Sequence, residues 1–143
     1  MKSCWLLFLA LLLCSGARNF GADDLKPSEV NTKTALHAAI SGQLEAFRKD
    51  DYAAAYVFAA QAIKAKFALE DFERMVRAGF PAIAHSTSAK FGLTFDNGDE
   101  AVINVRVFSE GREPVDYQYT MHRDGEAWRI TGVTLLKENS TEV

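Results

Sequence analysis

The pattern of apolar residues changes at Pro81, and this change limits the folds that the chain can adopt. Upstream of it, apolar residues recur at steps of three and four, the spacing of helices that bury one face. Downstream, apolar and polar residues alternate, as they do in strands with one buried face. Helices followed by strands predict an α+β fold, in which the N-terminal helices pack on one face of an antiparallel sheet.

The first predicted helix spans residues 32–49, and its apolar residues recur at steps of four, four and three. This spacing places them on one helical face, which we expect to be buried. Gly42 weakens the helix, but its missing side chain allows another element to come close. The apolar face consists of Leu36, Ile40, Leu44 and Phe47.

Two shorter helices are predicted between this helix and Pro81. An alanine-rich helix covers residues 51–60, and a third helix covers residues 69–76. Asp51 is expected to cap the alanine-rich helix, because a carboxylate at this position accepts hydrogen bonds from free backbone amides. Gly79 and Pro81 are expected to end the third helix.

Four strands are predicted downstream, and the dipeptides Asn-Gly, Glu-Gly and Asp-Gly that separate them are signals for hairpin turns. Three hairpins would join the four strands into an antiparallel meander, to which residues 82–86 would add a short fifth strand. The four predicted strands cover residues 89–95, 101–108, 114–122 and 127–136.

Alternation assigns the side chains of these strands to two faces of the sheet. One face is expected to be apolar, and the other, outer face only half apolar, which is typical of a contact surface. On the outer face, we expect Asp116 to pair with Arg129. The inner face, toward the helices, would carry Ala89, Phe91, Leu93, Phe95, Val115, Tyr117, Tyr119 and Met121. The outer face would carry Val102, Phe108, Val133 and Leu135 among the polar residues Asn104, Arg106, Gln118, Thr120, His122, Arg129 and Thr131.

Residues 1–17 have the pattern of a secretory signal peptide, with Lys2, a short apolar run and small residues up to Ala17. The apolar run is shorter than the roughly 20 residues of a membrane-spanning helix, so cleavage after Ala17 would leave no stable membrane span. We therefore expect a periplasmic or secreted protein. A lipoprotein anchored through Cys14 is the alternative, which the bulky Leu13 before it disfavours.

Cleavage would remove both cysteines, so the exported protein would have no disulfide and would depend on its core for stability. A polar linker at residues 18–31 would lead to a single domain at residues 32–137 and a tail at residues 138–143. Without Lys2, 15 basic residues face 19 acidic ones, a net charge of −4. This charge argues against nucleic acid as a partner.

Three stretches resemble a bacterial family of unknown function, number 4864; they read FRKDDYAAAYVFAAQAIKAKF, FERMVRAGFPAI and WRITGV. The order of elements is also similar to the cone-shaped fold of the nuclear-transport-factor-two-like superfamily, which includes ketosteroid isomerase and scytalone dehydratase. That resemblance implies a curved sheet closed on one side by helices, a pocket inside the cone, and a homodimer through the outer sheet face. The family resemblance implies no activity and no catalytic residues.

Aromatic side chains are the candidates to line such a pocket. No carboxylate falls on the inner positions, so we expect a non-catalytic domain that binds a small apolar or amphipathic ligand. Tyr56 has an alternative role in helix packing, because a buried tyrosine usually sends its hydroxyl to a nearby partner. The pocket candidates are Tyr56, Phe72, Phe91, Tyr117, Tyr119 and Trp128.

Two other functions remain open at this point. An isomerase-like or dehydratase-like enzyme would use His85, Tyr56, Tyr117 and Tyr119 as acid–base groups, and a partner-binding module would use the outer face around Arg106 and Arg129. His37, His85 and His122 lack a metal-ligand spacing such as HExxH, and no GxGxxG, P-loop or GxSxG motif is present. We therefore expect neither a metal nor a cofactor.

Overall fold

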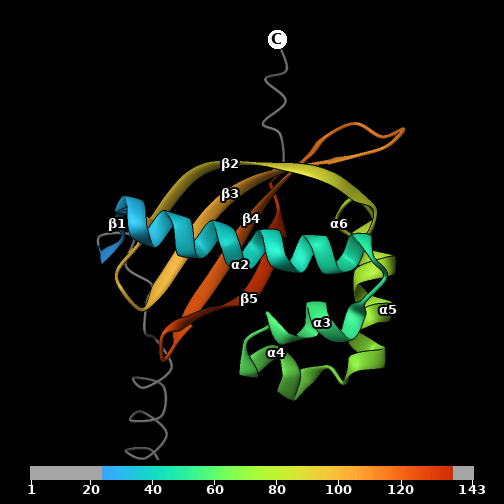
Figure 1. Cartoon of the computed structure of the whole chain (residues 1–143), viewed down its shortest axis with the longest axis horizontal. Helices are drawn as coiled ribbons and strands as arrows, with labels where there is room; N and C mark the ends of the chain where they lie inside the picture. The colour runs from blue at the N-terminus through green and yellow to red at the C-terminus, as the bar shows by residue number, and fades with distance from the viewer. Residues whose placement is uncertain (1–23, 137–143) are drawn as a thin grey trace, which may run out of the picture.

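The computed structural model describes residues 24–136, which form a five-stranded antiparallel sheet with helices over one of its faces (Figure 1). The order of the elements, helices before the main strands, confirms the α+β prediction. The expected signal peptide at residues 1–17, both cysteines and the tail at residues 138–143 lie outside the described residues. Among residues 24–136, no helix combines the length and the apolar character needed to cross a membrane.

The sheet is a meander in which each strand lies next to its neighbour in the sequence, in the order β1-β2-β3-β4-β5. The three predicted hairpins are confirmed. Their turn residues Gly98, Gly111 and Gly125 all have positive φ, a conformation that glycine adopts readily. The strands are β1 (Lys26–Pro27), β2 (Ser86–Asp96), β3 (Glu100–Ser109), β4 (Val115–Asp124) and β5 (Ala127–Leu135).

The longest helix, α2, lies across the strands and contacts both β2 and β5 (Figure 1). Its predicted apolar face is confirmed, since Leu36, Ile40, Leu44 and Phe47 are all buried. The helices are α2 (Val30–Arg48), α3 (Tyr52–Val57), α4 (Gln61–Lys66), α5 (Leu69–Gly79) and α6 (Pro81–Ala84).

The fifth strand differs from the one expected from the sequence. The prediction of a strand at residues 82–86 is wrong, because Pro81–Ala84 form the short helix α6. Pro81 lies in the first turn of α6, where its missing N–H removes no intrahelical hydrogen bond. The fifth strand is instead β1, from the stretch expected to be a polar linker, and it pairs Lys26 with Asp96 at the edge of β2.

An extra residue in β2 reverses the predicted alternation of that strand. Between Phe91 and Thr94, β2 advances three residues while β3 advances two. Because successive side chains point to opposite faces, one extra residue exchanges the faces of all residues beyond it. The predicted inner positions of Leu93 and Phe95 are therefore wrong: Leu93 is 66% exposed, and Phe95 pairs with Val102 of the outer face.

A second irregularity, with Thr131 as the extra residue, exchanges the faces in β5. Beyond it, Val133 pairs with Tyr119 and Leu135 pairs with Tyr117, both of which lie on the inner face. The prediction that Val133 and Leu135 belong to the outer face is therefore wrong. This exchange brings Val133 to the side of the sheet that the helices cover.

The segment after α3 is fastened to β5 by two hydrogen bonds. The Ala60 N–H donates to the Ile130 carbonyl, and the Ile130 N–H donates to the Phe58 carbonyl, both at 2.8 Å. The Phe58 ring lies against Gly42 of α2, where an added Cβ would be only 2.6 Å from the ring. The close approach predicted for Gly42 is therefore confirmed, and it joins α2 to β5 through the segment that follows α3.

Asp51 caps α3 as predicted, since its Oδ1 accepts a hydrogen bond of 3.0 Å from the Ala54 N–H. We expect Asp51→Ala to lower the free energy of unfolding by about 0.5–2 kcal/mol, because that amide loses its partner. Asp51→Asn is the control, since asparagine caps about as well as aspartate. Urea unfolding measures the difference, and an alanine variant as stable as the original chain would contradict the capping role.

Candidate functional site

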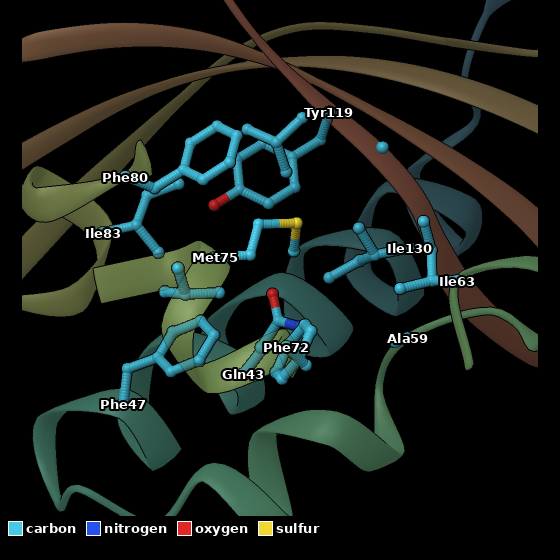
Figure 2. A pocket seen from close by; sticks show the side chains of 13 residues that line it. Gln43, Phe47, Ala59, Ile63, Phe72, Met75, Phe80, Ile83, Tyr119 and Ile130 are labelled. Carbon is cyan, nitrogen blue, oxygen red and sulfur yellow. The ribbon is translucent and has the colours of Figure 1, made fainter. Parts of the chain in front are cut away.

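The helices and the inner sheet face enclose a cavity of about 210 Å³ (Figure 2). Its lining comes from helices α2, α4, α5 and α6, from Ala59 after α3, and from strands β4 and β5. No single element builds it: α5 supplies Phe72 and Met75, while β5 supplies Ile130 and Val133. The cavity therefore depends on segments that are far apart in the sequence.

The cavity has a buried floor and a half-buried rim. Met75 extends into its centre in the view of Figure 2. Methionine is flexible and adapts to irregular spaces, so this side chain can move to admit a ligand. The floor consists of Gln43, Phe47, Ala59, Phe72, Val76, Ile83, Tyr119 and Ile130. The rim consists of Ile63, Met75, Phe80, Gly132 and Val133.

Two polar side chains reach the floor of this otherwise apolar cavity. Tyr119 of β4 is 0% exposed, and its hydroxyl has no hydrogen-bond partner among the described residues. Gln43 of α2 is also buried, and its Nε2 donates to the Ala55 carbonyl at 3.2 Å. Figure 2 shows the Tyr119 hydroxyl and the Gln43 amide oxygen both directed into the cavity. The floor therefore offers a hydrogen-bond donor and an acceptor.

Both polar groups on the floor are neutral. Burial raises the pKa of Tyr119 far above its ordinary value, and the neighbouring Tyr117 raises that pKa further. The phenol consequently stays protonated at physiological pH and acts as a hydrogen-bond donor rather than as a base. None of the residues that line the cavity is a lysine, arginine, histidine, aspartate or glutamate.

Two of the six predicted pocket residues, Phe72 and Tyr119, line the cavity. The other four do not line it. Tyr56 donates its hydroxyl to the Phe67 carbonyl at 2.6 Å, which agrees with its alternative role in helix packing. Phe91 stacks on His37 with 4.1 Å between ring centroids. Tyr117 and Trp128 are buried core residues elsewhere on the sheet.

The groups proposed for acid–base catalysis are not gathered at the cavity. Of His85, Tyr56, Tyr117 and Tyr119, only Tyr119 lines it. His85 is exposed and lines a separate open depression beside Arg48 and Glu110. This arrangement gives the phenol no titratable partner within the cavity lining.

Most of the chain, including all the residues that line the cavity, matches a known protein family. Residues 29–143 match the family described as Domain of unknown function (DUF4864). The chain belongs to DUF4864. The matched residues include every helix and strand that lines the cavity. Searches among curated proteins and among solved structures returned no match.

Several residues of the DUF4864 cavity were not found from the sequence. Gln43 carried a signal, because it lies three residues after Ile40 and four before Phe47, on the apolar face of α2. A glutamine on a buried helix face is uncommon enough to indicate a specific role. Val133 carried no such signal in the sequence, because the extra residue Thr131 decides which face of the sheet Val133 occupies. The other lining residues that were not predicted from the sequence are Phe47, Ala59, Ile63, Met75, Val76, Phe80, Ile83, Ile130 and Gly132.

None of the three histidines lines the cavity. His37 Nε2 hydrogen-bonds with the Thr94 hydroxyl at 3.2 Å, and His122 Nδ1 contacts a carboxylate oxygen of Glu100 at 2.7 Å. Within the described residues, no group of three or more potential ligands is placed to hold a metal ion.

The outer face of the DUF4864 sheet carries an ion pair that differs from the predicted one. Arg106 donates two hydrogen bonds of 2.8 Å to the Asp116 carboxylate. These hydrogen bonds lower the pKa of Asp116. The predicted pairing of Asp116 with Arg129 is therefore wrong, because Asp116 lies directly opposite Arg106 in the register of β3 and β4.

Proposed function

We propose that this DUF4864 protein is a non-catalytic binding protein, which holds a small apolar or amphipathic ligand in the cavity between the helices and the sheet. The observation that carries the proposal is an apolar cavity with no ionisable acid or base except one protonated phenol. Binding sites for small molecules are mostly apolar, with a few polar groups that fix the orientation of the ligand.

The size of the cavity limits the ligand. An apolar cavity of about 150 Å³ accommodates benzene, whereas pockets for drug-sized molecules occupy about 300–1,000 Å³. At about 210 Å³, this cavity lies between these two cases. The ligand is therefore about the size of one substituted ring or a short branched chain.

Catalysis has less support than binding. A general acid or base works best when its pKa is near the operating pH, and burial moves the pKa of Tyr119 away from that range. No second titratable group lines the cavity to assist it. An isomerase or dehydratase would need at least two such groups.

The proposal also includes the placement in the nuclear-transport-factor-two-like superfamily, export by the signal peptide at residues 1–17, and a homodimer through the outer sheet face. The helices over one sheet face support the superfamily placement. Val102 and Phe108 are apolar and partly exposed on the outer face, which supports the dimer. Light scattering distinguishes a dimer from a monomer. A partner-binding module around Arg106 and Arg129 has less support, since Arg106 is paired with Asp116.

Filling the cavity tests the binding function. We expect Val133→Phe to weaken the binding of toluene, used as a probe, by roughly tenfold or more, because the added ring takes space from the ligand. Leu135→Phe is the matched control, since Leu135 follows on the same strand and face but is exposed and outside the cavity. Calorimetric titration of the three proteins measures the dissociation constants.

The outcomes of this experiment separate the alternatives. Saturable binding to the original chain and to Leu135→Phe, with loss in Val133→Phe, supports the cavity as the site. Equal binding by all three proteins places the probe elsewhere, and an absence of saturable binding to the original chain removes the proposed function.

A further inference from the structure

The hydroxyl of Tyr119 is a buried polar group without a partner. Five buried hydroxyls within residues 24–136 lack a hydrogen bond, those of Ser28, Tyr52, Ser86, Ser109 and Tyr119. Of these five residues, only Tyr119 lines the cavity. A buried hydroxyl left unpaired destabilises the folded state, so each such group requires an explanation. A ligand in the cavity would give this hydroxyl an acceptor.

The amide of Gln43 complements this hydroxyl. A backbone carbonyl can only accept a hydrogen bond, so the contact of Gln43 with the Ala55 carbonyl assigns its nitrogen to that side. The amide oxygen is then turned toward the cavity, as Figure 2 shows. That oxygen is an acceptor, whereas the Tyr119 hydroxyl is a donor as long as it stays protonated.

These two polar groups lie on the floor rather than at the rim. Tyr119 is 0% exposed and Gln43 is 5% exposed, whereas Ile63, Met75 and Val133 of the rim are half-buried and apolar. A ligand that satisfies the polar groups must therefore enter with its polar end first. Its apolar part then remains among the rim residues.

We propose that the cavity selects a neutral alcohol or phenol, whose hydroxyl accepts a hydrogen bond from Tyr119 and donates one to Gln43. A hydroxyl suits both groups because it combines one donor with two acceptor lone pairs. This inference rests on the proposed binding function, and it adds the chemical class and the orientation of the ligand.

The same floor disfavours charged ligands. A carboxylate would face the Gln43 oxygen, which is an acceptor like itself, and would find only the Tyr119 hydroxyl as a donor. No basic side chain lines the cavity to compensate for the lost hydration of an anion. Burying an ion without a partner of opposite charge is strongly unfavourable. The selection is therefore for neutral molecules with one hydroxyl.

Three probes of similar shape test this selection: toluene, p-cresol and 4-methylbenzoate. For the full chain, we expect p-cresol to bind more tightly than toluene, and 4-methylbenzoate to bind most weakly. We expect Tyr119→Phe to weaken p-cresol binding by roughly three- to tenfold, the effect of one neutral hydrogen bond. Toluene binding should stay unchanged or become slightly tighter, because it makes no hydrogen bond.

Tyr52→Phe is the matched control. It removes a tyrosine hydroxyl that is also buried and also without a partner, but Tyr52 is not part of the cavity lining. Its affinities for all three probes should equal those of the original chain. Calorimetric titration, with thermal unfolding to verify that each variant is folded, provides the measurements.

The results distinguish failure of this inference from failure of the proposed function. If toluene binds but p-cresol gains nothing, or if Tyr119→Phe changes both affinities equally, the selection for a hydroxyl is wrong while the binding function stands. Tight binding of 4-methylbenzoate would also overturn the selection. If none of the three probes binds, the binding function fails and the selection fails with it.

Discussion

Replacing Leu36 with alanine is expected to lower the free energy of unfolding by about 2–5 kcal/mol. Leu36 is 0% exposed and belongs to the core between α2 and the sheet. The substitution removes three side-chain carbons and leaves a void that the neighbouring side chains fill only in part. A loss of this size is a large fraction of the total stability of a small domain, about 5–15 kcal/mol.

The matched control is the same substitution at an exposed leucine of β2. Leu93→Ala should change the stability by no more than about 0.5 kcal/mol, because Leu93 is largely in solvent. Urea unfolding with an unchanged slope compares the two variants on one scale. If Leu36→Ala and Leu93→Ala lowered the free energy of unfolding by the same amount, Leu93 would be a core residue. That result would contradict the assignment of an extra residue to β2.

The second large effect is expected at Gly42. Gly42→Leu should destabilise the protein by about 1–3 kcal/mol, the usual cost of overpacking, even though leucine favours helices over glycine by about 1 kcal/mol. The new Cβ would lie 2.6 Å from the Phe58 ring. The Phe58 carbonyl is hydrogen-bonded to Ile130, so the backbone at Phe58 is held and the ring can yield only by rotating about its side-chain bonds into a less favourable packing.

Two further variants separate this clash from other effects of leucine. Ala38→Leu, on an exposed site of the same helix, should change the stability by no more than about 0.5 kcal/mol. With Phe58→Ala in the background, Gly42→Leu should become neutral or stabilising, since the clashing ring is absent. A double-mutant cycle measures this coupling, and a cost at Gly42 that is independent of residue 58 would contradict the contact.

The candidate site was predictable only in part. Phe72 and Tyr119 could be chosen because the period of their own helix or strand placed them toward the core. Tyr56 satisfied the same criterion, but its hydroxyl is used by the Phe67 carbonyl, a contact that depends on how the chain folds back after α4. Gln43 could have been found as a glutamine on an apolar helix face, whereas Val133 could not.

The sequence by itself determined the type and the order of the main helices and strands, but not of the short elements β1 and α6. The apolar face of α2, the cap at Asp51 and the glycine turns of the three hairpins all depend on residues within a few positions of one another. Such local spacing controls backbone conformation directly. The α+β architecture follows from that order, and so does the arrangement of the main strands as a meander.

Only the tertiary structure decided which side chains meet. The faces of Leu93 and Val133 depend on extra residues in β2 and β5, which arise where neighbouring strands pair. A period of two makes one such residue sufficient to exchange the faces of the strand beyond it. The cavity is the space that side chains from several distant segments leave unfilled, so its volume and its polar floor depend on packing that no local pattern contains.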